Sequence, residues 1–203
     1  MKLNMFEALN KIDTAVLIWV HDYHNNIFDL FMPFVTDADN WVLPILVLIF
    51  YLGIKGQKRG KITLVLLIIA LTLADSICAQ LLKPFFERIR PSHCGYEGLH
   101  LLVSKGGKWS MPSNHAANIF TFAVILSYFY ERYKTPLFLL AYLIAFSRVY
   151  VGVHYPGDVL VGSIFGYALG WIILTLWVIL KMRELKRRQS WVWYESTPPI
   201  FKN

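Results

Sequence analysis

The chain has 203 residues, of which 56% are hydrophobic and only 16% carry a charge. Soluble domains hold about 25% charged residues, so this composition excludes an ordinary soluble enzyme and indicates a protein embedded in a membrane. The net charge of +7 does not indicate a nucleic-acid partner, because the positive charge is confined to short segments between apolar runs. The length suits one compact domain.

The first 40 residues mix apolar and polar side chains. Leu9 and Trp19 alternate with polar groups such as His21, a pattern typical of amphipathic helices that lie at a membrane surface. We therefore expect one or two interfacial helices in residues 1–40. The alternative is a further span within residues 5–35, which would place the N-terminus on the cytoplasmic side.

Five apolar runs follow, and we expect each to form a helix that crosses the membrane. Two of them reach the about 20 apolar residues that a full crossing needs, and three are shorter. The sequence predicts an all-α membrane protein with five transmembrane helices, or six with the alternative above. The core is residues 41–180 and the basic tail residues 181–203. The expected spans are residues 41–54, 62–82, 114–130, 135–151 and 159–180.

Basic residues gather in three segments outside these spans. Segment 55–61 holds four of the 20 Lys and Arg residues, turn 131–134 holds two, and residues 181–188 hold five. With five spans all three segments fall on one side, which the positive-inside rule identifies as the cytoplasmic side. Loop 83–113 and turn 152–158 are then expected on the opposite, extracytoplasmic face.

The last span contains Gly162, Gly166 and Gly170, which form two overlapping GxxxG units. Small residues at this spacing let another helix approach closely. The partner helix could belong to the same chain or to a second copy. A homodimer through this glycine face is therefore one possibility.

Three polar clusters remain, and the expected topology places all of them near the extracytoplasmic face. They stand at the end of the second span, at the start of the third, and between the fourth and fifth. The cluster residues that could carry chemistry are Lys83, Arg90, Ser113, Asn114, His115, Arg148, His154 and Asp158.

The cations of these clusters predict an anion-binding site. Lys83, Arg90 and Arg148 lie in or beside spans, where cations are costly and usually functional. The nearby carboxylates are too few to neutralise them, and the planar guanidinium fork matches a phosphate. Ser113 precedes a span and is a natural N-cap, and the free N–H groups of a helix start also attract anions.

The histidines predict nucleophilic chemistry at such a phosphate. Asp158 follows His154 by four residues, so its carboxylate can accept the Nδ1 proton and leave Nε2 as a nucleophile. His115, from another helix, could protonate the leaving oxygen. A nucleophile, a proton donor and surrounding positive charge are the parts that phosphoryl transfer needs. We expect neither a metal nor another cofactor.

Three further charged residues have simpler expected roles. Asp75 lies within the second span and is expected to hydrogen-bond across the bundle. Glu87 and Arg88, within the first cluster, are expected to pair with neighbouring groups.

The three clusters resemble the motifs of the type 2 phosphatidic acid phosphatase (PAP2) family, written K-x6-R-P, P-S-G-H and S-R-x5-H-x3-D. Asn114 stands where the second motif usually has glycine, and the other motif positions match. The motifs span residues 83–158, about a third of the chain. If position 114 requires a positive φ, asparagine is less favourable than glycine, although it tolerates that region better than most residues. Its amide could also contact the ligand.

The resemblance implies a role for each matched residue. His154 would attack phosphorus and form a phosphohistidine, Asp158 would orient it, and His115 would protonate the leaving group and then activate water. The remaining cluster residues would hold the phosphate: Lys83, Arg90, Ser113, Asn114 and Arg148.

The same resemblance implies a bacterial inner-membrane enzyme with its site facing the periplasm or exterior. Its substrate would be a lipid phosphate or diphosphate of the lipid A 1-phosphate, undecaprenyl diphosphate or phosphatidylglycerophosphate type. Two alternatives stay open at this point: a phosphotransferase that passes the phosphoryl group to a second lipid, and a non-catalytic binder of lipid phosphates. Binding alone would need the cations but not the histidine pair.

Overall fold

The computed structural model describes residues 2–187, 189 and 191–193, with side chains from residue 8 onward, so the predicted tail 181–203 lies partly outside the described residues. The all-α prediction is confirmed, since the described residues form helices with a single bridge, Ile89–Trp109, as their only extended pairing. The helices are α1 (Lys2–His21), α2 (Asn26–Thr36), α3 (Asp39–Phe50), η1 (Tyr51–Lys55), α4 (Gln57–Ile77), η2 (Cys78–Leu82), α5 (Lys83–Phe86), η3 (Pro91–His93), α6 (Asn114–Phe129), η4 (Glu131–Tyr133), α7 (Lys134–Tyr150) and α8 (Pro156–Lys186).

Among the described residues, two helical segments are long and apolar enough to cross a membrane. One is Gln57–Phe86, in which α4, η2 and α5 run on without a break, and the other is α8. The helices α2 and α3, the latter continued by η1, meet at an angle of 49° and make a third crossing if the bent pair counts as one span. Helices α6 and α7 have 16 and 17 residues, fewer than the about 20 of a full crossing. The five-span count therefore stays a prediction.

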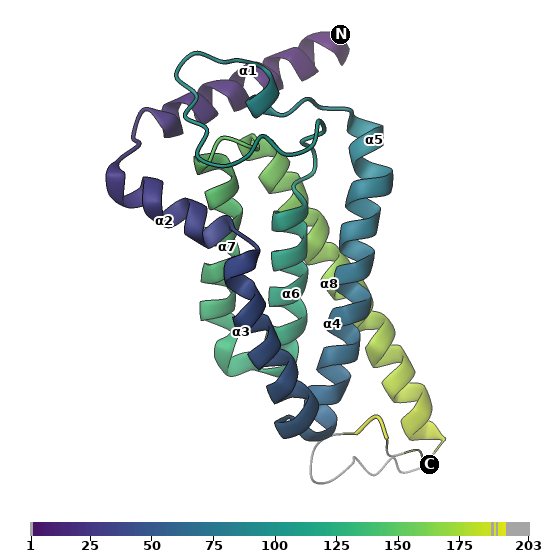
Figure 1. The fold of residues 1–203 in the computed structure, drawn as a ribbon. Coiled ribbons are helices and arrows are strands. Elements are labelled where there is room, and N and C mark those ends of the chain that lie inside the picture. The colour runs from purple at the N-terminus through teal and green to yellow at the C-terminus, as the bar shows by residue number, and fades with distance from the viewer. Residues whose placement is uncertain (1, 188, 190, 194–203) are drawn as a thin grey trace.

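Helix α1 lies across one end of the bundle, above the start of α8 and the end of α7 (Figure 1). On the side of α1 that faces the bundle, Leu17 and His21 are buried. On its other side, Leu9, Ile12 and Trp19 are 55%, 62% and 59% exposed. A helix that packs one side on the protein and leaves large apolar groups on the other suits the predicted interfacial position. The loop between α5 and α6 folds over the same end of the bundle (Figure 1).

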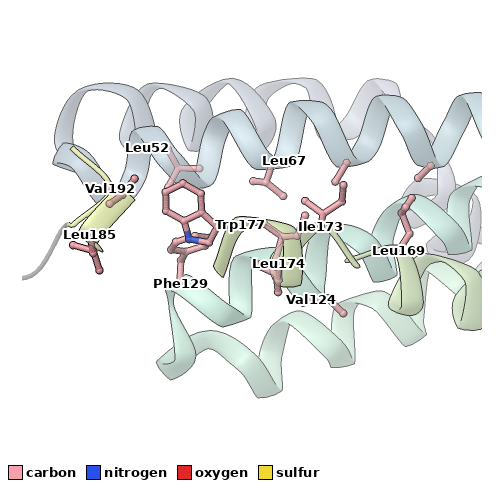
Figure 2. Close-up of a cluster of buried hydrophobic side chains, with 13 residues drawn as sticks. Leu52, Leu67, Val124, Phe129, Leu169, Ile173, Leu174, Trp177, Leu185 and Val192 are labelled. Carbon is pink, nitrogen blue, oxygen red and sulfur yellow. The ribbon is translucent and has the colours of Figure 1, made fainter. Parts of the chain in front are cut away.

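Helix α6 stands at the centre of the bundle, between α4, α7 and α8 (Figure 1). Figure 2 shows the largest buried cluster, in which Leu67, Val124 and Leu174 come from α4, α6 and α8. Phe129 and Trp177 extend this cluster toward the end of the bundle opposite α1. The cluster holds the helices that carry the three polar motifs in one rigid unit.

The glycine face of α8 packs on α6 of the same chain. A Cβ atom at Gly162 would lie 2.6 Å from the carbonyl oxygen of Ser113, and one at Gly166 would collide with the carbonyl of Ala117. A Cβ atom at Gly170 would lie 2.8 Å from the Val124 side chain. Within the chain, the partner helix of this face is α6, which is the first of the two alternatives given above.

Replacing Gly166 by alanine is expected to lower the melting temperature in detergent by about 5 °C or more. The added methyl group must displace a backbone carbonyl, and such overpacking costs about 1–3 kcal/mol. Thermal unfolding of the purified protein, followed by tryptophan fluorescence, measures the change. The control is Gly107→Ala, whose Cβ would meet no atom within 4 Å. Equal melting temperatures for the two variants would contradict the assigned helix contact.

Candidate active site

His154 and Asp158 form a buried pair at the start of α8. Their side chains are 1% and 0% exposed, and His154 Nδ1 lies 3.4 Å from Asp158 Oδ2. The same Oδ2 accepts a hydrogen bond of 2.9 Å from the backbone N–H of Tyr155, which caps the helix. Pro156 at the first helical position favours a helix start there. Local helix capping thus places the carboxylate beside the imidazole.

Burial keeps the His154 imidazole neutral at ordinary pH. The pKa of His154 is lowered to about 4, chiefly by desolvation and also by the charges of Arg90 and Arg148, while the hydrogen bond to Asp158 opposes the shift. A neutral imidazole carries one proton, and the Asp158 carboxylate holds that proton on Nδ1. The Nε2 atom then keeps a free lone pair, which is what a nucleophile requires.

Two buried guanidinium groups lie near this pair. Arg148, at the end of α7, is 9% exposed, and Arg90, in the loop after α5, is 8% exposed. Arg148 Nη1 donates to Thr36 Oγ1 at 2.6 Å, and its buried Nε has no hydrogen-bond partner. Arg90 Nε donates to the carbonyl of Trp109 at 3.1 Å. Within the described part of the chain, neither has a carboxylate within 4.0 Å.

The loop between α5 and α6 holds Arg90 in place. Its segment 88–90 runs beside segment 108–110, with hydrogen bonds from Arg90 N to the Lys108 carbonyl and from Ser110 N to the Arg88 carbonyl. Gly106, at φ +67°, lies against the guanidinium, since a Cβ there would be 3.0 Å from Arg90 Nη1. Glycine is suited to this position because it adopts a positive φ without strain.

Lys83 and His115 complete the group of chemically active side chains. Lys83 begins α5, at the end of the long α4 segment, and lies close enough to Arg90 and Arg148 to interact electrostatically. His115, in the first turn of α6, is also close enough to interact electrostatically with His154, Lys83 and both arginines. The structure therefore brings the cations and histidines of all three predicted clusters to one place.

Ser113 joins the second cluster to the third. It is fully buried, and its Oγ accepts the N–H of Ala116 as the N-cap of α6. Its own N–H donates to the Asp158 carbonyl at 3.0 Å. The predicted cap is found, and the start of α6 is fastened beside the His154–Asp158 pair.

Asn114 occupies its position without strain. It is the first residue of α6 and is not among the described residues with positive φ. Its Nδ2 donates to Asp75 Oδ1 at 2.7 Å, and Asn118 donates to the same oxygen at 3.4 Å. The predicted cross-bundle role of Asp75 is confirmed. The Asn114 side chain is turned toward α4, so its predicted place in the phosphate site depends on its backbone N–H alone.

Two contact residues were not identified from sequence, whereas the expected pairing of Arg88 is found. Thr36 holds Arg148 from the end of α2, and Asp13 of α1 joins Arg88 beside Asp158. Thr36 and Asp13 belong to no motif, and each lies far along the sequence from the arginine that it contacts. Arg88 did carry a signal, because it lies two residues before Arg90 and so falls on the same side of an extended segment.

Known proteins are similar to this chain in sequence and in fold. The chain is 32% identical to the lipid A 4'-phosphatase of Bacteroides thetaiotaomicron over 176 residues, which cover 83% of this chain and 78% of that protein. It is 32% identical to the putative undecaprenyl-diphosphatase YbjG of Escherichia coli, over 74% of each chain. The crystal structure of Aquifex aeolicus LpxE superposes with a TM-score of 0.61 at 29% identity, covering 80% of this chain and 94% of the other.

The family model of the PAP2 superfamily matches residues 61–181, which is more than half of the chain and includes all three clusters. Its match begins in α4 and ends in α8, the two long apolar segments. The structure is a helical bundle with the three motifs in this order, as the resemblance predicted. This protein belongs to the PAP2 superfamily.

Proposed function

We propose that the protein is a membrane lipid phosphatase that hydrolyses a lipid phosphate or diphosphate without a metal, through a phosphohistidine on His154. One observation carries this proposal: Arg90 and Arg148 are buried, and no carboxylate among the described residues neutralises them, beside a neutral, buried His154. Buried cations without a counter-charge at ion-pair distance are unfavourable. A bound phosphate would supply the missing negative charge to both guanidinium groups.

The first step would form the enzyme intermediate. His154 Nε2 attacks phosphorus, an N–P bond forms, and the bond from phosphorus to the lipid oxygen breaks. The negative charge of the bound phosphate favours a proton on His115, and His115 gives this proton to the departing oxygen. Asp158 keeps the Nδ1 proton of His154 and stabilises the positive charge that develops on the ring. Lys83, Arg90, Arg148 and the N–H groups at the start of α6 surround the phosphoryl oxygens.

The second step would release phosphate. A water molecule attacks phosphorus, and its proton passes to His115. The N–P bond breaks, its electron pair returns to His154 Nε2, and inorganic phosphate leaves. Both histidines then return to their starting protonation states.

The location of the site favours a lipid substrate. The cluster lies at the end of the bundle opposite turn 131–134 and segment 55–61, the basic segments expected in the cytoplasm (Figure 1). We place it at the extracytoplasmic surface, at the level of lipid headgroups. The relatives named above support a lipid A phosphate or undecaprenyl diphosphate, and a similar protein named phosphatidylglycerophosphatase B adds a third class.

Phosphate release from a panel of these lipids tests the proposal. We expect the protein, purified in detergent, to release inorganic phosphate from at least one of the three classes, equally well with and without EDTA. The reason is that His154 and the cations supply the nucleophile and the positive charge that a metal would otherwise provide. The control is His154→Ala, prepared and assayed in parallel.

Other outcomes would contradict the proposed mechanism or indicate a different function. Loss of activity with EDTA would contradict the metal-free mechanism. Phosphate that appears on an acceptor lipid, with none free in solution, would indicate a phosphotransferase. Binding of lipid phosphates without turnover would indicate a non-catalytic binder, a reading that the oriented His154–Asp158 pair disfavours.

A further inference from the structure

Arg88 lies between two carboxylates that come from distant parts of the chain. Its Nη1 donates to Asp158 Oδ1 at 2.8 Å, and its Nη2 donates to Asp13 Oδ2 at 2.6 Å. The guanidinium also stacks on the Tyr155 ring, 3.9 Å from the ring centre. Carboxylates therefore occupy both ends of its fork. This distinguishes Arg88 from Arg90, whose charge is left for an anionic ligand.

Arg88 supplies the counter-charge to the Asp158 carboxylate. The carboxylate is fully buried, and among the described residues Arg88 is the only permanent cation within 4.0 Å of it. Its second oxygen, Oδ2, faces Tyr155 N–H and His154 Nδ1. A buried carboxylate without a counter-charge tends to take up a proton.

Either route for that proton would disable His154. If the proton goes to the carboxyl group, Asp158 can donate to Nδ1, and the ring proton moves to Nε2. If the proton goes to the ring, His154 becomes an imidazolium with a proton on both nitrogens. In both cases Nε2 loses the lone pair that attacks phosphorus.

We propose that Arg88 is a positioning residue: it keeps Asp158 ionised and oriented, so that His154 holds its proton on Nδ1 and presents a free Nε2. This inference rests on the proposed phosphatase function and adds a residue that the three family motifs do not include. Arg88 acts through Asp158 and does not touch the phosphate.

Asp13 attaches α1 to the same assembly. Its Oδ2 accepts from Arg88, and its Oδ1 accepts from the backbone N–H of Gly157 at 2.7 Å. A Cβ at Gly157 would lie 2.7 Å from Asp13 Oδ2, so α1 approaches the start of α8 very closely. Asp13 fixes the far side of Arg88, but the charge of Asp158 is balanced by Arg88 itself. The two residues should therefore respond differently to substitution.

The dependence of kcat/KM on pH shows whether Arg88 positions Asp158 or only attaches α1 to the start of α8. Arg88→Met is expected to lower kcat on the order of 100-fold and to move the acid limb to higher pH by about one unit or more. Arg88→Lys restores a positive charge and should return the limb toward the wild-type position. The other charged groups near His154, namely Arg90, Arg148 and His115, are the same in all variants.

Two control variants complete the set. Asp13→Asn loosens α1 without removing the counter-charge of Asp158, so its acid limb should not move to higher pH. Arg132→Met, an exposed arginine in η4 at the other end of the bundle, should match the wild type. If Arg88→Met and Asp13→Asn both lose thermal stability and activity alike, with the acid limb unmoved, Arg88 only fastens α1 and the proposal is wrong.

A second measurement needs no turnover. Nitrogen NMR of protein labelled at its histidines, with the His154 signals assigned from His154→Gln, reports which ring nitrogen carries a proton. At pH 6 we expect the neutral Nδ1–H form in the wild type and either the imidazolium or the Nε2–H form in Arg88→Met. This change without any phosphate release would retain the positioning role and refute the phosphatase. Phosphate release by the wild type, together with an unchanged His154 signal in Arg88→Met, would support the phosphatase function and refute the positioning role.

Discussion

Replacing His154 by glutamine is expected to lower phosphate release by about four orders of magnitude or more and to abolish covalent labelling of the protein. Glutamine retains a polar side chain but cannot form the N–P bond. Loss of a nucleophile from a coupled catalytic set has an effect of this size. The label is measured by mixing the protein with a lipid that carries radioactive phosphate and stopping the reaction in alkaline denaturant, because an N–P bond survives alkali and is cleaved by acid.

The matched control is His100→Gln. His100 lies in the loop between α5 and α6, its side chain is exposed, and its backbone N–H donates to His21. We expect this variant to be labelled like the wild type. A label in His154→Gln that equals the wild-type label, or turnover within tenfold of the wild type, would show that another group attacks phosphorus.

The residues of the candidate site were predictable because they lie in local motifs. Helix starts and ends place Lys83, Ser113, Arg148 and Asp158, and the alternation of spans and loops brings those ends to the same face. The sequence therefore predicted which side chains meet. The buried, neutral state of His154 depends on what covers it, and no motif contains that information.

The contacts of the N-terminal helices were not predictable in the same way. Asp13 and Thr36 reach Arg88 and Arg148 only because α1 and α2 lie over the end of the bundle, and amphipathic periodicity does not specify where such a helix docks. For a related reason, the sequence did not show which helix packs on the glycine face of α8. A GxxxG pattern favours close packing but does not say on which helix. The orientation of the Asn114 side chain was not predictable either, because it is fixed by a hydrogen bond to Asp75, which lies 39 residues away.

His115→Ala is expected to lower turnover of an alkyl phosphate lipid about 1,000-fold, within the range for loss of a general acid–base group. The alkoxide that leaves is strongly basic and needs a proton, which the variant cannot supply. A diphosphate releases a weakly basic phosphate group instead, so formation of the phosphoenzyme should be affected far less. Labelling rates with a lipid A phosphate and with undecaprenyl diphosphate, measured in one series, test this difference.

The same variant should accumulate the intermediate, because His115 also activates the water that hydrolyses it. With a diphosphate substrate, we expect the labelled fraction of His115→Ala to exceed that of the wild type, and the double variant with His154→Gln to carry no label. Equal losses for both leaving groups, without accumulation, would remove His115 from the proton-transfer role.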